Sequence, residues 1–268
     1  MTERLTNLAA VKDWLGINSD TSDTGLMRLI DAASQFTLNY LNRDSFQAKS
    51  YTQNFQGNRK RTTLIRNWPI VSVSSVGVDG RLIPASTFGV GGKPSDGYSI
   101  SDARNAPQSV DLHGCYWYYG YCQVIYIAGF QSTQTNKIPA PAEGETYGMI
   151  TAGVMGVWSS DQGVTIDGTL APQVDADPAA GEYMVDEWGN YSFNTADQGK
   201  TSVISYTYTP FDVSFAVTQL IGGFYNRKDR IGVLSKTLGG QETITFLSTD
   251  MTDDIKKLLQ NYKNEIPV

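Results

Sequence analysis

The sequence predicts an α+β fold, in which N- and C-terminal helices form a helical body that carries two inserted antiparallel β regions. Apolar residues recur at spacings of three and four near both ends, whereas period-two alternation fills the middle. Neither terminal helix pair is long enough to bury a core alone, so we expect the two pairs to pack together. The expected domains are a helical body of residues 1–44 and 211–268, a first β domain of 45–130 and a second of 140–210.

The N-terminal segment predicts two helices. Leu8, Val11 and Leu15 fall on one face of a short helix, which Gly16 ends. Cap-forming residues at 19–23 then precede a long amphipathic helix, which we expect to end near residues 42–44. Its apolar positions are Leu26, Leu29, Ile30, Ala33, Phe36, Tyr40 and Leu41.

The pattern then changes to that of short strands. The segment 69–80 alternates with period two and ends in an Asp-Gly turn, which is typical of a hairpin. Further strands are expected at 51–55, 62–66, 98–100, 110–112 and 123–129. Residues 131–145, rich in Thr, Pro and Ala, are expected to form a linker to the second β region.

The second β region echoes the first in three places that follow the same order. The segment 78–84 is similar to 166–172, 97–100 to 182–185, and 123–126 to 202–206. Each match alone is weak, because Asp-Gly turns and alternating strands are common. Their shared order favours a duplication.

Helical spacing returns near the C-terminus. An apolar stripe predicts a helix over about 211–226, and Asp212 in its first turn suits the helix dipole. Residues 242–246 could pair as a strand. A last helix is expected to open at Asp250, Asp253 and Asp254 and to bury Ile255, Leu258, Leu259 and Tyr262.

Charge and composition narrow the function classes. The chain of 268 residues has 21 Lys and Arg against 27 Asp and Glu, a net charge of −6. The one tight basic cluster is Arg59, Lys60 and Arg61, which argues against a protein that holds nucleic acid by its phosphates. No signal peptide or membrane span is expected. Two cysteines do not make a disulfide framework, so we expect folding in a reducing cytoplasm.

We expect no catalytic, cofactor or metal site. His113, Cys115 and Cys122 lie close in sequence, but a structural zinc site needs four ligands and this is the one histidine. The pair Asp175 and Asp177 lacks the spacing and the bidentate Glu of a calcium loop. The glycine-rich segment 89–94 lacks the pattern of a phosphate loop. No nucleophile, base and orienting residue can be assembled around a single histidine.

The aromatic run Tyr116, Trp117, Tyr118 and Tyr119 is expected to lie in a β-hairpin that turns near Gly120. Tyr and Trp are enriched at protein interfaces, so contact between subunits is the favoured interpretation. Packing in the core and a platform for carbohydrate are the alternatives.

Several motifs follow one another in a fixed order along the chain. They are 8–17, 26–34, Tyr40-Leu41-Asn42-Arg43, 68–76 with Asp79-Gly80, 124–130 with Ile138-Pro139, and 224–232 with Gly239-Gly240. None is specific alone, but together, over about residues 5–139 and 211–262, they resemble the head–tail connector, or adaptor, proteins of tailed bacteriophages.

The resemblance implies a non-enzymatic virion protein, assembled in the host cytoplasm and located in the neck at the head–tail interface. It implies a homo-oligomeric ring, commonly of twelve subunits, between the portal protein and a tail-side neck or tail terminator protein. DNA would pass the lumen without specific binding, and about twelve copies at −6 give a formal charge of roughly −70 that repels DNA. The family also suggests that the last segment docks on the portal, here Asn264, Glu265, Ile266, Pro267 and Val268.

The chain departs from the family pattern after Ile138-Pro139. About 70 residues of expected β structure follow, where the family leads almost directly into its third helix. The resemblance gives this insertion no role. A second hypothesis is therefore a baseplate or host-recognition module whose aromatic β domain binds glycan.

Overall fold

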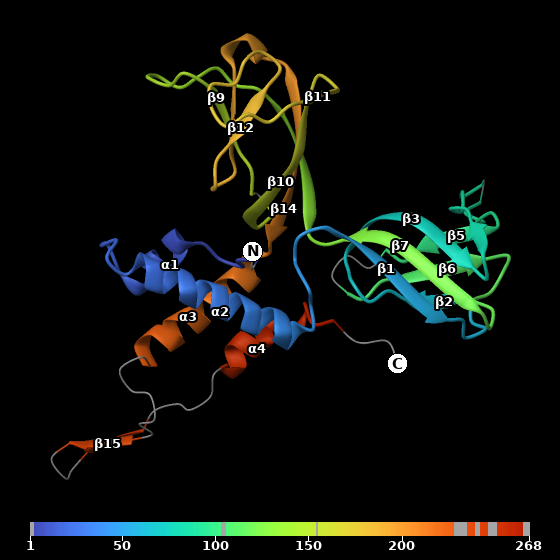
Figure 1. Cartoon of the computed structure of the whole chain (residues 1–268), viewed down its shortest axis with the longest axis horizontal. Helices are drawn as coiled ribbons and strands as arrows, with labels where there is room; N and C mark the ends of the chain where they lie inside the picture. Colours follow the sequence, from blue (N-terminus) through green and yellow to red (C-terminus); the bar gives the residue numbers. More distant parts are fainter. Residues whose placement is uncertain are drawn as a thin grey trace. The chain divides into compact units, whose positions relative to one another are not determined.

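The fold is mainly β, and the predicted α+β fold built on a helical body is wrong. The computed structural model describes residues 3–89, 91–102, 106–153, 155–227, 235–238, 242–245 and 251–264. In this part of the chain, strands form two sheets of four strands, two sheets of three and one two-stranded hairpin, all by antiparallel pairing (Figure 1). The four described α-helices hold only 8, 19, 17 and 8 residues. The β segments build cores of their own, so the helices are not the frame of the molecule.

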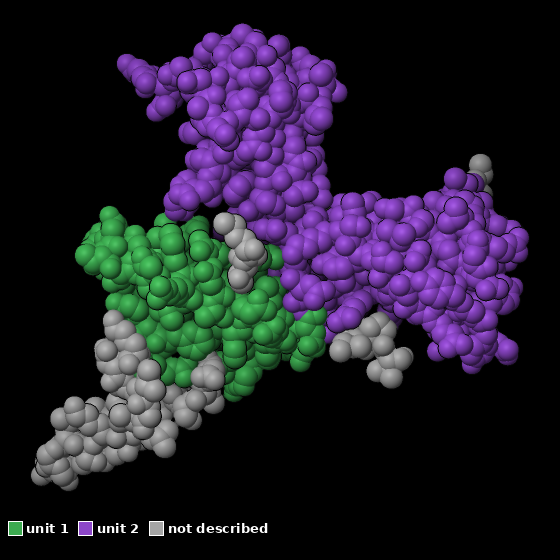
Figure 2. Space-filling view, viewed as in Figure 1, with its two compact units in different colours: residues 1–42, 210–263 green, residues 43–209, 264–268 purple. Residues whose placement is uncertain are grey.

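The chain divides into two compact units, coloured separately in Figure 2. Unit 1 comprises Met1–Asn42 and Pro210–Lys263, and unit 2 comprises Arg43–Thr209 with Asn264–Val268. The α-helices all lie in unit 1, whereas the large sheets and the short 3-10 helix Thr195–Asp197 lie in unit 2.

The helices of unit 1 begin and end at residues whose chemistry suits those positions. They are α1 (Leu8–Leu15), α2 (Asp23–Leu41), α3 (Phe211–Arg227) and α4 (Asp253–Gln260). The Asn7 side chain accepts a hydrogen bond from the Ala10 amide at the start of α1, and Gly16 ends this helix in the left-handed conformation. Asn42 ends α2 in the same way, so both predicted N-terminal helices are confirmed.

Apolar contacts join α3 to the N-terminal helices. The Trp14 and Phe215 rings meet edge to face with centroids 5.4 Å apart, and Phe36 contacts Phe224 at 6.3 Å. The buried face of α3 includes Val213, Ala216, Val217, Leu220 and Ile221. Unit 1 also contains the hairpin of β15 (Ser235–Leu238) and β16 (Glu242–Thr245), where the sequence predicted a strand over 242–246.

The first half of unit 2, here called module 1 (residues 45–130), contains two sheets. Their strand orders are β1-β7-β3-β4 and β2-β6-β5. The strands are β1 (Lys49–Gln56), β2 (Thr62–Leu64), β3 (Ile70–Val78), β4 (Arg81–Ile83), β5 (Gly97–Ile100), β6 (Ser109–His113) and β7 (Tyr121–Ala128). Buried residues from both sheets form one core, among them Val76, Val110, Leu112, Val124 and Tyr126.

The second half of unit 2, module 2 (residues 131–209), also contains two sheets, ordered β8-β14-β10-β11 and β9-β13-β12. The strands are β8 (Gln131–Lys137), β9 (Gly148–Thr151), β10 (Val157–Ile166), β11 (Thr169–Ala171), β12 (Tyr183–Val185), β13 (Asn190–Phe193) and β14 (Thr201–Thr209). The predicted linker over 131–145 is therefore wrong in its first half. Residues 131–137 are polar because β8 is an edge strand, paired with β14 alone.

The two modules have the same topology, strand for strand. In sequence order, β1 to β7 occupy the same places in their sheets as β8 to β14. The Asp-Gly turns at Asp79 and Asp167 share a positive φ, 50° and 47°. The Tyr98 amide donates to the Pro84 carbonyl at 2.9 Å, and the Tyr183 amide donates to the Pro172 carbonyl at 3.2 Å. The three predicted sequence echoes lie at these equivalent positions, while descent of both modules from one ancestor stays a prediction.

Module 2 differs from module 1 by a polar network in its core. The Asp161 carboxylate, at a bulge in β10, accepts hydrogen bonds from the Tyr183 hydroxyl at 2.6 Å and the Tyr191 hydroxyl at 2.8 Å. The Trp158 indole N–H donates to the Tyr191 oxygen at 3.3 Å. Both tyrosines are almost fully buried. Burial, together with the hydrogen bond to Asp161, raises the pKa of both phenols far above its ordinary value.

This network predicts that module 2 loses stability in alkaline solution. The tyrosine pKa is near 10 in the unfolded chain and higher in the folded one, so the folded state binds more protons above that pH. The contribution of the two phenols to the free energy of unfolding should be constant below about pH 10 and fall as the pH rises further. Denaturant titrations at several pH values check this. The variant Tyr183→Phe with Tyr191→Phe lacks these two phenols, so its free energy of unfolding should fall less steeply with pH. Some fall should remain, because burial also raises the pKa of Tyr126 and Tyr208.

Candidate functional site: an arginine–tyrosine surface on module 1

Two loops at one end of module 1 bring together the basic cluster and the aromatic run. Residues 57–61 join β1 to β2, and residues 114–120 join β6 to β7. The two loops are hydrogen-bonded along their backbones. The Gly57 amide donates to the Gly120 carbonyl at 3.2 Å, Arg59 to Trp117 at 2.7 Å and Trp117 to Lys60 at 2.9 Å. We call these two loops the tip of module 1.

Trp117 anchors the aromatic run, and it is not available as a subunit contact. Its side chain is 0% exposed and meets the Phe55 ring at a centroid distance of 5.1 Å. The predicted aromatic hairpin is also wrong, since residues 114–120 form a loop and β7 begins at Tyr121. Burying the indole turns its neighbours outward, and Tyr116, Tyr118 and Tyr119 are 41%, 55% and 64% exposed.

Arginine side chains lie over the exposed tyrosines. The Arg59 guanidinium is 4.6 Å from the Tyr119 ring centroid, and that of Arg61 is 5.0 Å from Tyr116. Arg61 also donates to the Tyr116 hydroxyl at 3.3 Å. Among the described residues, Arg59, Lys60 and Arg61 form no ion pair. Tyr and Arg dominate the energetic centres of protein interfaces, so this composition is that of a binding surface.

Gly57 holds the two loops at their short separation. A Cβ atom at this position would overlap the backbone carbonyl groups of Trp117 and Tyr118, which belong to the opposite loop. We therefore expect Gly57→Ala to lower the free energy of unfolding by about 1–3 kcal/mol, because the loop backbones must separate. Gly25→Ala is the matched control. Gly25 lies exposed in α2 with no atom near the added methyl, so that change should stabilise by up to ~1 kcal/mol. Equal effects in denaturant unfolding would contradict this role of Gly57.

The residues considered for metal binding do not form a site. The His113 ring nitrogen Nε2 lies 2.8 Å from the Ser99 hydroxyl, while both cysteines are free. Burial raises the pKa of the Cys115 and Cys122 thiols, which favours their protonated form. In the part of the chain that the structure describes, no three His, Cys, Asp or Glu side chains gather around a possible metal position.

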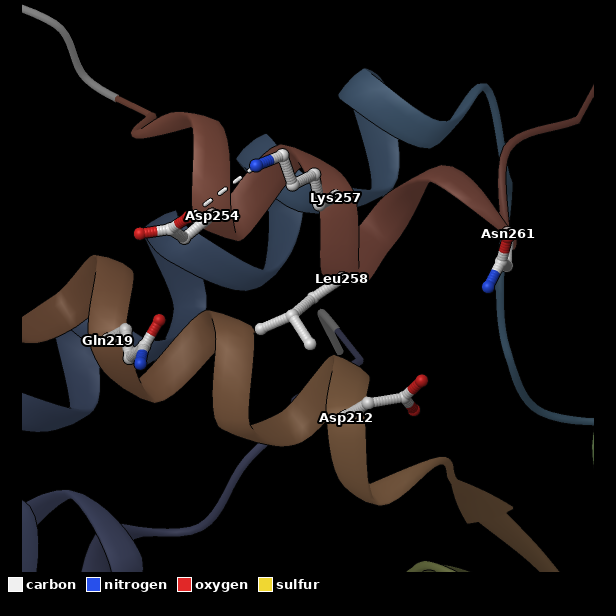
Figure 3. A pocket seen from close by; sticks show the side chains of 6 residues that line it. All are labelled: Asp212, Gln219, Asp254, Lys257, Leu258 and Asn261. Atoms are coloured by element: carbon white, nitrogen blue, oxygen red, sulfur yellow. Dashed lines mark ion pairs between the residues drawn. The ribbon is translucent and has the colours of Figure 1, made fainter.

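A shallow groove in unit 1 offers no catalytic arrangement (Figure 3). Its volume is about 410 Å³, and its lining residues are Asp212, Gln219, Asp254, Lys257, Leu258 and Asn261. The charged groups are already engaged with one another or with neighbours. Lys257 pairs with Asp254 at 4.0 Å, and the Tyr262 hydroxyl donates to the Asp212 carboxylate at 2.8 Å. The side chains drawn in Figure 3 do not converge on one point.

The segment expected to dock on the portal is only partly described. Asn264 is buried, and its side-chain amide donates to the Asn67 oxygen at 3.3 Å within unit 2. The remaining members, Glu265, Ile266, Pro267 and Val268, lie outside the described residues. The last resemblance motif, 224–232 with Gly239-Gly240, is described only over 224–227, since the segments 228–234 and 239–241 lie outside the described residues as well.

Several motif residues of the resemblance meet in unit 2, where they have a structural role. The Arg43 guanidinium donates to the Trp68 carbonyl at 2.6 Å and lies 4.0 Å from the centroid of its ring. It also lies over Phe46 and Phe130, at 5.4 and 5.5 Å. We call these four residues the Arg43 cluster. Gly129, beside it, has a φ of 147° and no room for a Cβ atom against the backbone at Ala48.

These features define a class of protein: a β-rich chain with an exposed arginine–tyrosine surface, without an assembled catalytic or metal site among its described residues. No described helix is long and apolar enough to cross a membrane. Residues 4–99 match the family model of the head completion protein (HCP), a component of the phage head–tail connector. The predicted resemblance is thereby confirmed over this segment, which is less than half of the chain. Curated proteins yield no match to the sequence.

The match supports a structural part in joining the phage head to the tail, as a virion component. It favours a structural over an enzymatic protein. The segment contains α1 and α2, the first four strands and most of β5, and both Arg43 and Trp68 of the Arg43 cluster. It also contains Arg59, Lys60 and Arg61, but not the tyrosines of the tip.

Proposed function

We propose that the chain is a connector subunit that forms a ring between the portal and the neck or tail and leaves a channel for DNA. The match of residues 4–99 to the head completion family carries this proposal. A ring subunit needs surfaces that bind copies and neighbours rather than a reactive site. The tip of module 1 has the composition of such a surface. The proposed location is the neck of the virion, after assembly in the host cytoplasm.

The channel is proposed to pass DNA without holding it. The subunit carries a net charge of −6, and a ring of about twelve copies would carry roughly −70, which repels a DNA backbone. The basic tip of module 1 would then face away from the lumen. The proposed partners are other copies of the chain, the portal protein and a tail-side neck or tail terminator protein.

Electron microscopy of the purified chain mixed with its portal protein tests the ring. We expect an axial ring on one face of the portal, coaxial with its channel. A portal that never acquires axial density at saturating chain concentration would contradict the proposal.

A truncation tests the proposed portal contact. Removal of residues 265–268 should weaken portal binding in a pull-down by about tenfold or more, while Asn264 and its contact with Asn67 are kept. A chain with these four residues replaced by Gly and Ser is the length-matched control, and it should behave like the truncated one. Undiminished binding by both variants would place the portal contact elsewhere.

A further inference from the structure

The two modules have one topology but opposite charges. Module 1 contains eight Lys and Arg against four Asp and Glu, a net charge of +4. Module 2 contains two lysines and no arginine against ten Asp and Glu, a net charge of −8. The overall charge of −6 therefore hides a strong asymmetry inside unit 2. Opposite charges on separate surfaces of one chain favour association between copies of that chain.

The contrast includes loops at equivalent places in the two modules. The loop of residues 57–61 after β1 carries Arg59, Lys60 and Arg61, whereas the loop of residues 138–147 after β8 carries Glu143 and Glu145. Both loops pair with the loop before the long central strand, Gly57 with Gly120 and Ile138 with Gly199. All five charged side chains are exposed.

We infer that the tip of module 1 docks on the acidic loop of module 2, residues 138–147, in a second copy of the chain. The Arg59 and Arg61 guanidinium groups would each bind a carboxylate of Glu143 or Glu145 in the two-pronged geometry that favours this pairing. Tyr116, Tyr118 and Tyr119 would add hydroxyl donors and bury the faces of their rings. Within one molecule, none of the described acidic side chains forms an ion pair with Arg59, Lys60 or Arg61, so the tip is free for another copy.

Docking between two different surfaces has a consequence for assembly. Each copy offers one basic tip and one acidic loop, so contacts run head to tail, and they close into a ring when the rotation permits. The inference rests on the proposed ring function and names the lateral surfaces of that ring. Arginine and tyrosine also suit single-stranded nucleic acid, by phosphate contact and stacking. The net charge of −8 on module 2 of the same chain favours a protein partner, and the experiment includes DNA as a competing outcome.

Charge reversal in the full chain tests the docking. Variant A carries Arg59→Glu and Arg61→Glu, and variant B carries Glu143→Arg and Glu145→Arg. Sedimentation velocity at low salt, over a concentration series up to about 1 mM, measures association. We expect the unaltered chain to associate, each variant alone to associate about tenfold or more weakly, and an equimolar mixture of A and B to recover. Recovery is expected because the acidic tip of A meets the basic loop of B, and the basic tip of B meets the acidic loop of A.

The matched control is Lys49→Glu with Arg66→Glu, which makes the same change of charge in module 1. Both side chains are exposed, and both lie at the opposite strand ends from the tip. This variant should associate like the unaltered chain. Recovery by mixing also shows that A and B are folded, since unfolded partners would not restore each other.

Several results would overturn the docking. They are an unaltered chain that stays monomeric at every concentration, variants that associate normally, and a mixture that does not recover. Fluorescence anisotropy with a labelled 20-nucleotide DNA strand, and with its duplex, tests whether the tip binds DNA instead. DNA binding that variant A loses while its self-association is unchanged would assign the tip to nucleic acid. If axial rings form on the portal with variants A and B alike, the docking fails while the connector function stands.

Discussion

Arg43→Ala is expected to lower the free energy of unfolding of unit 2 by about 3 kcal/mol or more. The guanidinium is buried, lies over three aromatic rings and donates to the Trp68 carbonyl. A hydrogen bond from a charged donor contributes about 1.5–3 kcal/mol, and a desolvated cation–π contact about 2 kcal/mol. Alanine would also leave a cavity among the rings of Trp68, Phe46 and Phe130. Denaturant unfolding followed by tryptophan fluorescence, to which the buried Trp68 and Trp117 contribute, measures the loss.

Arg4→Ala is the matched control for this change. Arg4 pairs with Asp31 at 2.7 Å, but its side chain is 47% exposed, and exposed pairs contribute less than about 1 kcal/mol. The loss in free energy of unfolding for Arg43→Lys should lie between those for Arg43→Ala and Arg4→Ala, since lysine keeps the charge but lacks the planar group that stacks on Trp68. A cost for Arg43→Ala no larger than that of Arg4→Ala would contradict the structural role of the Arg43 cluster.

The Arg43 cluster explains why the resemblance could be read from the sequence. Arg43, Trp68 and Phe130 stand in separate motifs, and their contact makes each depend on the others. Residues that pack on one another inside the protein indicate a fold shared with the family rather than a binding partner shared with it. Local signals were equally readable, because a helix that ends at Gly16 or Asn42 does so through its own backbone conformation.

The fold class could not be predicted from the sequence, because it depends on which helices and strands share a core. Helical spacing identifies an amphipathic face, but not the size of the body that the face belongs to. The alternating strands of 45–209 build two cores of their own, and only the paired register makes that visible. The sequence did not predict β8, because Thr, Gln and Ser on an edge strand resemble a linker in composition.

The sequence predicted the two residue runs of the candidate site but not their contact. The basic cluster at 59–61 and the aromatic run at 116–119 were both identifiable, but their contact was not, since about 55 residues separate them. The burial of Trp117 was also hidden, because an aromatic run does not say which ring points inward. The opposite charges of the modules could be counted from the sequence, but their meaning depends on the shared topology.

Asp161→Val is expected to destabilise module 2 by about 3 kcal/mol or more. The change removes the carboxylate that accepts from Tyr183 and Tyr191, and leaves two buried hydroxyl groups without this partner. Each such group costs about 1–3 kcal/mol when its acceptor is lost. Hydrogen exchange of the β10 and β14 amides reports on module 2 separately from the rest of the chain.

Replacing Asp161, Tyr183 and Tyr191 together should lower the free energy of unfolding less than replacing Asp161 alone. Module 1 has Val73 opposite Tyr126, where module 2 has Asp161 opposite Tyr206, so the same topology tolerates an apolar residue there. The variant Asp161→Val with Tyr183→Phe and Tyr191→Phe retains no hydroxyl that needs the carboxylate. We expect it to regain most of the stability that Asp161→Val alone loses, because replacing the carboxylate and both hydroxyl groups by apolar groups is nearly neutral. The recovery is incomplete, because the half-buried Trp158 indole N–H loses the Tyr191 oxygen as its acceptor. A triple variant as unstable as the single one, or less stable, would show that Asp161 acts through the β10 bulge rather than through its two hydrogen bonds.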